Sequence, residues 1–301
     1  MRIAIVGSGA LGLFYGAHLQ RAGNEVRFLL RRDYDAITKN GLQVRSINGD
    51  FHLPVVSGFR QAAEIGPVDL VVIGLKTWAN DRYPELVGPL VGSETMILTL
   101  QNGLGNEERL AELFGADRVY GGVAYLGANR EEPGTVCHLA AGRIILGPIM
   151  AHNSGHAEEI AGLFSAAGIP CHAVADIQRA RWEKLVWNIP FNGLCALMQR
   201  SVDVFLASSK TTEIISRIMR EVIAAANAQG LQEPIPEAYA DEMITFTRAM
   251  TASYRPSMQI DRAEGRPLEL EALIARPLQD GQDRGVDMPL TAALYALLDL
   301  P

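Results

Sequence analysis

A glycine-rich turn near the start of the chain constrains its fold more than any other feature. The turn, GSGALG at residues 7–12, follows an apolar run over residues 3–6 that is typical of a buried parallel strand. The apolar pattern after the turn predicts a helix over residues 10–20. In such a turn the first glycine permits the tight bend, the second lets a pyrophosphate approach the backbone, and the third lets the helix pack on the strand. Amide groups at the helix start then face the phosphates. The residues predicted to bind a dinucleotide here are Gly7, Ser8, Gly9, Ala10, Leu11 and Gly12.

A secretory signal peptide is the alternative interpretation of this segment. Met1 and Arg2 would form its basic end, and the apolar residues that follow would form its hydrophobic core. Glycines at dinucleotide spacing are unusual in such a core, and cleavage would remove the first predicted strand. We therefore expect the segment to stay in the folded protein.

Composition and charge limit the classes of function. With 301 residues, 48% of them apolar and 20% charged, the chain suits two globular domains of ordinary size. Its net charge of −7 disfavours binding to nucleic acid or to an anionic membrane surface. The sequence has no apolar run of the length that a membrane-spanning helix requires. We expect a protein that acts on a small molecule and binds neither nucleic acid nor membrane.

The cysteines and histidines give no sign of a disulfide framework or of a metal site. Cys137, Cys171 and Cys195 are odd in number and lack C-x-x-C spacing, so we expect free thiols in a reducing compartment, the cytoplasm. His152 and His156 lie in a polar segment that offers no third ligand, which favours a surface position.

The two halves of the chain follow different patterns. Up to about residue 170, strand runs alternate with helical segments, as in α/β domains with a parallel sheet; beyond Asp176 only helical patterns remain. We therefore predict a Rossmann-type dinucleotide-binding domain over residues 1–172 and an all-α domain over residues 173–301. The later predicted strands cover residues 25–30, 68–75, 95–100, 119–126 and 143–146, the last two as antiparallel additions at the sheet edge. The later predicted helices cover residues 34–39, 106–114, 154–167, 177–198, 211–229, 236–252, 257–284 and 290–299.

Two arginines after the second predicted strand indicate which dinucleotide binds. NAD sites place a carboxylate there, about twenty residues past the glycines, to hold the ribose 2′-hydroxyl. This chain has Arg31 and Arg32, whose guanidinium groups suit the 2′-phosphate of NADP. Asp33 lies beside them, and its negative charge weakens the case for a 2′-phosphate site. The alternative is that Arg31 and Arg32 are two solvated arginines on a loop. The sequence predicts NADPH, with Arg31 on the 2′-phosphate.

Two further strands end in polar residues that could face the same ligand. Lys76 follows the strand predicted over residues 68–75, and Asn102 follows the one over residues 95–100. Ligands of open α/β sheets bind outside the carboxyl ends of the strands, so we expect Lys76 near ribose or substrate and Asn102 near ribose or the nicotinamide. An ordinary turn is the alternative for Asn102-Gly103, since Asn-Gly is a common turn dipeptide.

One helix of the second half carries polar residues at regular spacing. Lys184, Asn188 and Asn192 recur every four residues and so share one face among apolar neighbours. Pro190 should kink this helix, because a proline in a helix interior costs about 3 kcal/mol. The pattern fits a cavity wall and also an ordinary helix surface, and the residues alone leave both open.

Together these segments resemble the ketopantoate reductase (2-dehydropantoate 2-reductase) family over nearly the whole chain. Each motif is weak alone, whereas their order and spacing are specific. The resemblance is carried by GSGALG at 7–12, Arg31, GLK ending at Lys76, QNG around Asn102, WEKLVWNIPFN at 182–192, and a late segment from Ser257 to Glu269.

The resemblance implies NADPH-dependent reduction of 2-dehydropantoate to (R)-pantoate, a step of pantothenate and coenzyme A synthesis, without a metal. It implies that Lys184 is the general acid that protonates the carbonyl oxygen, and that Glu269 supports the lysine and the bound substrate. Asn102 would lie near the nicotinamide and the substrate, and Lys76 near the cofactor. The residues implied to hold the hydroxyls and carboxylate of the substrate are Asn188, Asn192 and Ser257.

Departures from the family pattern concern the substrate. After Asn192 the chain reads GLCA, where the family often has Pro-Leu-Thr-Ala, and residues 199–202 lack the usual later asparagine. Residues 254–256 (YRP) and 268–271 (LELE) also differ. A reductase of another 2-oxo acid on the same scaffold therefore stays open, as does a non-catalytic NADPH sensor, although a sensor needs no acid at a carbonyl. The apolar helical half could pack against the sheet or against a second subunit, and we expect a homodimer.

Overall fold

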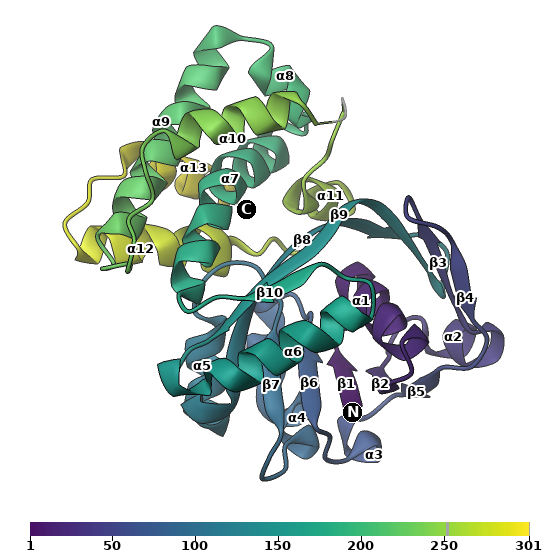
Figure 1. Cartoon of the computed structure of the whole chain (residues 1–301). Helices are drawn as coiled ribbons and strands as arrows, with labels where there is room; N and C mark the ends of the chain where they lie inside the picture. The colour runs from purple at the N-terminus through teal and green to yellow at the C-terminus, as the bar shows by residue number, and fades with distance from the viewer. Residues whose placement is uncertain (251–252, 301) are drawn as a thin grey trace. The chain divides into compact units, whose positions relative to one another are not determined.

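The computed structural model describes residues 1–250 and 253–300, which form two compact units. The first, the sheet unit, contains residues 1–101 and 106–177. The second, the helical unit, contains residues 102–105 and 178–301. In Figure 1 the purple-to-teal strands belong to the sheet unit, and the green and yellow helices belong to the helical unit.

The sheet unit is built on a mixed sheet with ten strands among the described residues. Neighbouring strands follow the order β4-β3-β9-β8-β7-β6-β1-β2-β5, and β10 pairs with β9. β1 pairs in parallel with β2 and β6, and β6 pairs in parallel with β7, which gives the parallel core that the alternating pattern predicts. The strands are β1 (Arg2–Val6), β2 (Glu25–Leu29), β3 (Leu42–Ser46), β4 (Phe51–Leu53), β5 (Ser57–Phe59), β6 (Leu70–Ile73), β7 (Met96–Thr99), β8 (Val119–Arg130), β9 (Thr135–Pro148) and β10 (Cys171–Ala173).

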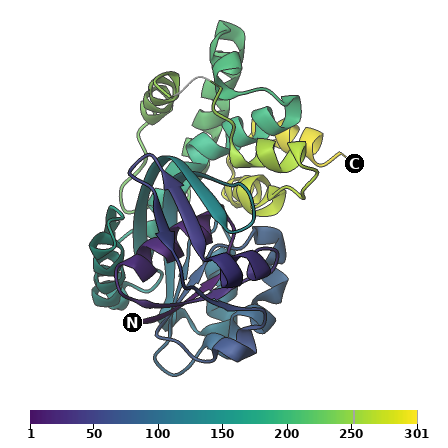
Figure 2. The ribbon, with the colours of Figure 1, turned by 90° about the vertical axis from the view of Figure 1, so that its right-hand side faces the viewer.

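Two hydrophobic cores cover the two faces of this sheet. Ile3 and Ile5 of β1 enter one core, whereas Ala4 and Val6 enter the other. A strand buried on both faces needs an unbroken apolar run, which is the signal at the start of the chain. α1 and α6 contribute to the first core, and α3 to α5 contribute to the second. Figure 2 shows the ribbon turned by 90° from the view of Figure 1. The helices of this unit are α1 (Ala10–Arg21), α2 (Tyr34–Asn40), α3 (Ala62–Ile65), η1 (Thr77–Arg82), α4 (Tyr83–Leu86), η2 (Gly88–Leu90), α5 (Asn106–Phe114), η3 (Ala116–Arg118), η4 (Ala151–Asn153) and α6 (Ser154–Ala166).

The two strands predicted at the sheet edge lie inside the sheet, so that placement was wrong. β8 pairs in parallel with β7 and antiparallel with β9, and β9 pairs in parallel with β3. Four short strands that the sequence did not predict, β3, β4, β5 and β10, extend the sheet around them. These strands have three to five residues, too few for alternation to give a clear signal.

The helical unit consists of helices and connecting segments, as the pattern of the second half predicts. All of its helices, together with a π-helical turn, η5, contribute apolar residues to its core. No described helix is long and apolar enough to cross a membrane. The helices are α7 (Ile177–Met198), α8 (Val202–Leu206), α9 (Ser209–Asn227), α10 (Tyr239–Arg248), α11 (Ser257–Ala263), η5 (Glu271–Ala275), α12 (Arg276–Asp283) and α13 (Pro289–Leu298).

The single helix predicted over residues 257–284 is wrong. α11 ends at Ala263, and Gly265 follows with a φ of +65°, a conformation that favours glycine. Pro267 then lacks an N–H for a helical hydrogen bond, and helical structure resumes only at η5. The helix predicted over residues 236–252 corresponds to α10, and residues 251–252 lie outside the described part of the chain.

Candidate active site

The glycine-rich turn has the geometry that a dinucleotide requires. Gly7 has a φ of +96°, and a Cβ there would lie 2.4 Å from Leu75 N, so a larger residue does not fit. A Cβ on Gly12 would lie 2.4 Å from Gly7 O, where α1 packs on the turn. A Cβ on Gly9, by contrast, would have no neighbour within 4 Å. The second glycine therefore leaves open space beside the start of α1, where the pattern places the pyrophosphate.

The start of α1 suits an anion. Gly9 is the N-cap residue, no side chain caps the helix, and its first turn contains no acidic residue. Unpaired N–H groups and the helix dipole therefore favour phosphate at this end. Ser8 Oγ donates to Leu29 O at 2.9 Å, which ties the turn to the last residue of β2.

Arg31 and Arg32 follow β2 at the same edge of the sheet. Val6 of β1 and Leu29 of β2 are in register, so the glycine turn and the two arginines leave neighbouring strand ends. Both arginines are exposed, and neither has an ion pair with any described residue. Their guanidinium groups are therefore available to an anionic ligand.

The carboxylates near these arginines have arginine partners of their own. Asp33 is 3% exposed, and its Oδ1 accepts a hydrogen bond from Arg130 Nη2 at 2.5 Å. Asp35 pairs with Arg60 at 2.7 Å. The negative charge that Asp33 brings to this segment in the sequence is thus balanced within the sheet unit.

Lys76 follows β6 after Gly74 and Leu75, at the strand end next to the glycine turn. Gly74 N donates to Val6 O at 2.8 Å, which continues the pairing of β6 with β1 past the strand. Lys76 is the N-cap residue of η1, and its side chain is half-buried. Three segments that precede Asn102 are predicted from the sequence to bind the cofactor: the glycine turn, the arginine pair and Lys76. They therefore lie at the same edge of the parallel sheet.

A buried amide network fixes the chain after β7, and the sequence analysis missed it. Tyr83 Oη donates to Gln101 Oε1 at 2.6 Å, and Gln101 Nε2 donates to Asn80 Oδ1 at 2.8 Å. Asn80 in turn donates to Asn106 Oδ1 at 2.8 Å. The network includes the residues that flank the 102–105 segment, Gln101 and Asn106. Its members come from separate segments, so they share no periodic spacing by which the sequence could reveal them.

Residues 102–105 group with the helical unit, although they follow a strand of the sheet unit. Leu104 N donates to Ala272 O at 3.0 Å, and Arg181 Nη1 donates to Gly103 O at 3.3 Å. Gly103 has a φ of +82°, and a Cβ there would lie 2.3 Å from Ala272 O. The Asn-Gly pair is therefore a turn, and it is packed against α7 and η5 in a way that fixes Asn102.

Lys184 of α7 contacts Asn102 directly. Its Nζ donates to Asn102 Oδ1 at 2.5 Å, across 82 positions of sequence. Burial lowers the pKa of Lys184 to about 7, the charge of Arg181 lowers it as well, and the buried carboxylate of Glu269 opposes both effects. An amine with this pKa can hold and release a proton near neutral pH.

The three residues implied to bind substrate form a chain of hydrogen bonds. Asn192 Oδ1 accepts from Met258 N at 3.1 Å and from Ser257 Oγ at 3.3 Å, which fixes the start of α11. Asn192 Nδ2 donates to Asn188 Oδ1 at 3.3 Å. The Nδ2 of Asn188 donates to no described residue, so it is the available donor of this chain.

The predicted residues thus fall into two groups, one in each unit. The group in the sheet unit consists of Gly7, Ser8, Gly9, Ala10, Leu11, Gly12, Arg31 and Lys76. The group in the helical unit consists of Asn102, Lys184, Asn188, Asn192, Ser257 and Glu269.

The Gly103 turn gives a prediction about the placement of Asn102. We expect Gly103→Ala to lower kcat about tenfold, because relief of the clash with Ala272 displaces Asn102 from Lys184. Gly105→Ala is the matched control: Gly105 also has a positive φ, +88°, but its Cβ would meet nothing within 4 Å. Steady-state kinetics with thermal unfolding checks both, and equal losses of kcat from the two variants would contradict the account.

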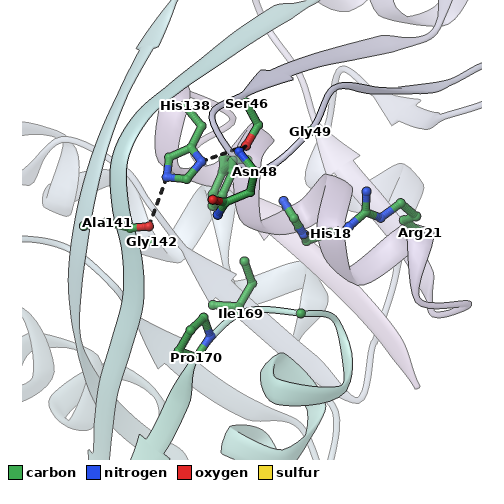
Figure 3. A pocket seen from close by; sticks show the side chains of 12 residues that line it. His18, Arg21, Ser46, Asn48, Gly49, His138, Ala141, Gly142, Ile169 and Pro170 are labelled. Atoms are coloured by element: carbon green, nitrogen blue, oxygen red, sulfur yellow. Dashed lines mark hydrogen bonds between the residues drawn. The ribbon is translucent and has the colours of Figure 1, made fainter.

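A cavity of about 180 Å³ lies elsewhere in the sheet unit (Figure 3). His18, Ser46 and His138 are among its lining side chains. His138 Nε2 donates to Ala141 O at 3.1 Å, which leaves Nδ1 to accept from Ser46 Oγ at 2.9 Å. No residue predicted for the site lines this cavity, so we do not assign it to the reaction.

The cysteines and the two spaced histidines lie outside both groups. Cys137, Cys171 and Cys195 are free thiols, and burial raises the pKa of Cys171 and of Cys195 to about 12. His152 is exposed beside Asp117, at 3.1 Å. Among the described residues, no group of three or more His, Cys, Asp or Glu could hold a metal ion.

Comparisons with known proteins find the same family along nearly the whole chain. Two family models match it: "Ketopantoate reductase PanE/ApbA" over residues 3–150 and "Ketopantoate reductase PanE/ApbA C terminal" over residues 176–300. A 2-dehydropantoate 2-reductase of Nostoc sp. is 40% identical over 98% of this chain and 93% of its own. A crystal structure of 2-dehydropantoate 2-reductase from Geobacter metallireducens is 60% identical, with a TM-score of 0.98 over 99% of both chains. D-mandelate dehydrogenase, solved with NADH and anilino(oxo)acetate, shares the fold at 23% identity, with a TM-score of 0.90 over 99% of this chain and 97% of that one.

Proposed function

Because the chain belongs to the ketopantoate reductase family, we propose that it reduces 2-dehydropantoate to (R)-pantoate with NADPH, in pantothenate and coenzyme A synthesis. The observation that carries the proposal is the contact of Lys184 Nζ with Asn102 Oδ1, beside the buried carboxylate of Glu269. A buried ammonium that an amide oxygen orients is suited to protonate a ketone oxygen.

Lys184 supplies the proton of the reaction. NADPH, when bound, supplies a hydride to the carbonyl carbon. The Lys184 ammonium hydrogen-bonds the carbonyl oxygen and stabilises the negative charge that develops there as the C=O π bond breaks. Its proton then passes to that oxygen, which leaves an alcohol and a neutral amine, and solvent restores the ammonium.

Asn102 and Glu269 set the position and the charge of this lysine. Asn102 Oδ1 accepts one N–H of Lys184, which fixes the orientation of the ammonium group. Glu269 opposes the lowering of the Lys184 pKa, so the ammonium persists near neutral pH in spite of its burial. We assign catalytic contact with substrate to Lys184 and Asn102 and electrostatic support to Glu269.

The Asn188–Asn192–Ser257 chain is proposed to hold the substrate. The Nδ2 of Asn188 is the group that we assign to a substrate oxygen, because it donates to no described residue. Asn192 has both polar atoms engaged with Asn188, Ser257 and Met258, so its role is to position those residues. Ser257 keeps a hydroxyl oxygen that can accept a hydrogen bond from a substrate hydroxyl.

The sheet unit is proposed to hold NADPH. The open space at Gly9, the uncapped start of α1 and the unpaired guanidinium groups of Arg31 and Arg32 fit the pyrophosphate and the 2′-phosphate. Lys76 would hydrogen-bond the ribose side of the cofactor. A protein with this fold is solved with NADH, so side chains rather than the fold select the cofactor.

Arg31 gives a prediction about the cofactor. We expect Arg31→Ala to weaken NADPH binding about 30-fold and NADH binding less than about twofold, because only NADPH has the 2′-phosphate that the guanidinium would bind. Fluorescence titration of both reduced cofactors measures the two dissociation constants. Arg45→Ala, which removes an exposed arginine paired with Glu131, is the control. Equal weakening of both cofactors by Arg31→Ala would refute the assignment.

A substrate panel separates the three functions that the sequence leaves open. We expect NADPH oxidation to be fastest with 2-dehydropantoate, and loss of that turnover in Lys184→Ala. A faster rate with another 2-oxo acid would instead assign the chain to that substrate. NADPH binding without turnover on any member of the panel would support the sensor and overturn the reductase.

Assembly, location and domain roles complete the proposal. We propose a homodimer, as in the dimeric ketopantoate reductase of Staphylococcus aureus, and light scattering at several concentrations tests it. We propose the cytoplasm as its location, on the ground that the three cysteines are free. The cofactor is assigned to residues 1–172 and the substrate to residues 173–301 together with Asn102.

A further inference from the structure

We propose that Arg130 determines the preference for NADPH over NADH by acting through Asp33, without touching the cofactor. The inference rests on the proposed function, because it concerns the cofactor-binding end of the same site. It assigns a role to a residue that no sequence motif in the first half of the chain includes.

Arg130 reaches Asp33 because the β8–β9 hairpin is long. β8 has 12 residues and β9 has 14, more than most strands in globular proteins. The turn of the hairpin packs on α2: a Cβ on Gly134 would lie 3.6 Å from Ala36 Cβ and 3.6 Å from Ile37 Cγ1. Arg130 is the last residue of β8, and it thereby meets Asp33 at the start of α2, 97 positions away in the sequence.

The Asp33 carboxylate is committed to Arg130 and not to the helix that follows. Asp33 is the N-cap residue of α2, a position where aspartate commonly accepts a hydrogen bond from the helix backbone. Its side chain makes no such bond, and its Oδ1 accepts from Arg130 Nη2 at 2.5 Å instead. With 3% of Asp33 exposed, solvent does little to compensate its charge, so the guanidinium does.

Without Arg130, this carboxylate would compete for the arginines that face the cofactor. Arg31 and Arg32 precede Asp33 directly, and neither has an ion pair among the described residues. A carboxylate that pairs with either guanidinium removes a donor from the 2′-phosphate and adds a repelling charge beside it. NADH has a neutral hydroxyl at that position, so its binding would change little. Arg130 is in this sense a positioning residue for cofactor selection.

Three variants test the proposal: Arg130→Gln, Asp33→Asn, and the double variant D33N/R130Q. The readout is the ratio of the NADPH and NADH dissociation constants, from fluorescence titration of folded protein checked by circular dichroism. A purely structural role moves both constants together and leaves the ratio unchanged. Arg45→Gln is the matched control, because it breaks an arginine–carboxylate contact of 2.6 Å with Glu131 in the same unit.

We expect Arg130→Gln to lower the preference for NADPH about tenfold, and the double variant to restore it to within about threefold of wild type, since removing both charges leaves nothing to compete. Asp33→Asn alone should keep the preference. Failure of the double variant to restore it would overturn the proposal, since Arg130 would then act on the cofactor itself. A tenfold loss of the preference for NADPH in Asp33→Asn would also overturn the proposal. The Asp33→Asn measurement can be made even if Arg130→Gln does not fold. The wild-type preference and Arg31→Ala test the proposed cofactor separately.

Discussion

Lys184→Ala should lower kcat for ketone reduction about 1,000-fold while leaving the dissociation constant of NADPH within about threefold of wild type. The substitution removes both the proton donor and the positive charge beside the developing alkoxide. The cofactor residues belong to the sheet unit, whereas Lys184 contacts Asn102 in the helical unit. Single-turnover mixing of the NADPH-bound protein with 2-dehydropantoate measures the hydride step itself.

Two control variants define the role of this lysine. Lys210→Ala removes an exposed lysine of α9 and should leave kcat unchanged. Lys184→Arg keeps the charge but holds its proton at neutral pH, so we expect it to remain about 100-fold below wild type. Partial rescue of Lys184→Ala by a small primary amine would support proton donation. Turnover of Lys184→Ala within about tenfold of wild type would show that another group is the acid.

Gly9→Ala should abolish most NADPH binding without destabilising the protein. Gly9 has ordinary extended torsions, φ −79° and ψ −163°, and its Cβ would meet no protein atom within 4 Å. The methyl group would instead occupy the space proposed for the pyrophosphate, and we expect the dissociation constant to rise about 100-fold. Isothermal titration with NADPH and thermal unfolding of the free protein give the two quantities.

Substitutions at two other glycines serve as comparisons for Gly9→Ala. Gly162→Ala in α6 also meets nothing within 4 Å, and it should change neither binding nor, by more than about 1 kcal/mol, the free energy of unfolding. Gly7→Ala should destabilise the protein, because its Cβ would lie 2.4 Å from Leu75 N. Wild-type NADPH affinity in Gly9→Ala would place the pyrophosphate elsewhere.

Local sequence patterns predicted the parts of the fold that depend on local chemistry. The apolar run of β1 reflects burial on both faces. Gly7 reflects a close contact with the end of the adjacent strand, and Gly12 reflects one with the turn itself. The break at Gly265 and Pro267 was missed, because amphipathic periodicity continues across a short interruption. The interior place of β8 and β9 was missed because periodicity carries no information about which strands pair.

The contacts that define the candidate site are mostly long-range, and a single sequence does not reveal them. Lys184 and Asn102 were each identified, but their contact spans 82 positions. In the sequence, the negative charge of Asp33 disfavoured the assignment of NADPH as cofactor. Its partner Arg130, which balances this charge in the structure, lies 97 positions away. The amides around Gln101 come from several segments and share no spacing.

Some departures from the family pattern have a packing explanation. A Cβ on Gly193 would lie 2.6 Å from Leu294 Cδ2, so the glycine after Asn192 leaves room for the Leu294 side chain of α13. Tyr254 lies edge-on to Trp187, with ring centroids 6.2 Å apart. These changes therefore affect the packing of the helical core. The substrate panel decides whether they also change which 2-oxo acid is reduced fastest.

The pH dependence of kcat/KM for the 2-oxo acid at saturating NADPH tests Lys184 as the acid most directly. Reduction needs the ammonium form, so the rate should be constant at low pH and fall about tenfold per pH unit above an apparent pKa of about 7. Lys184→Arg should lose this fall over the same range, because its guanidinium stays protonated. A wild-type rate that stays constant from about pH 6 to about pH 9, or that rises across that range, would contradict the assignment of Lys184 as the general acid.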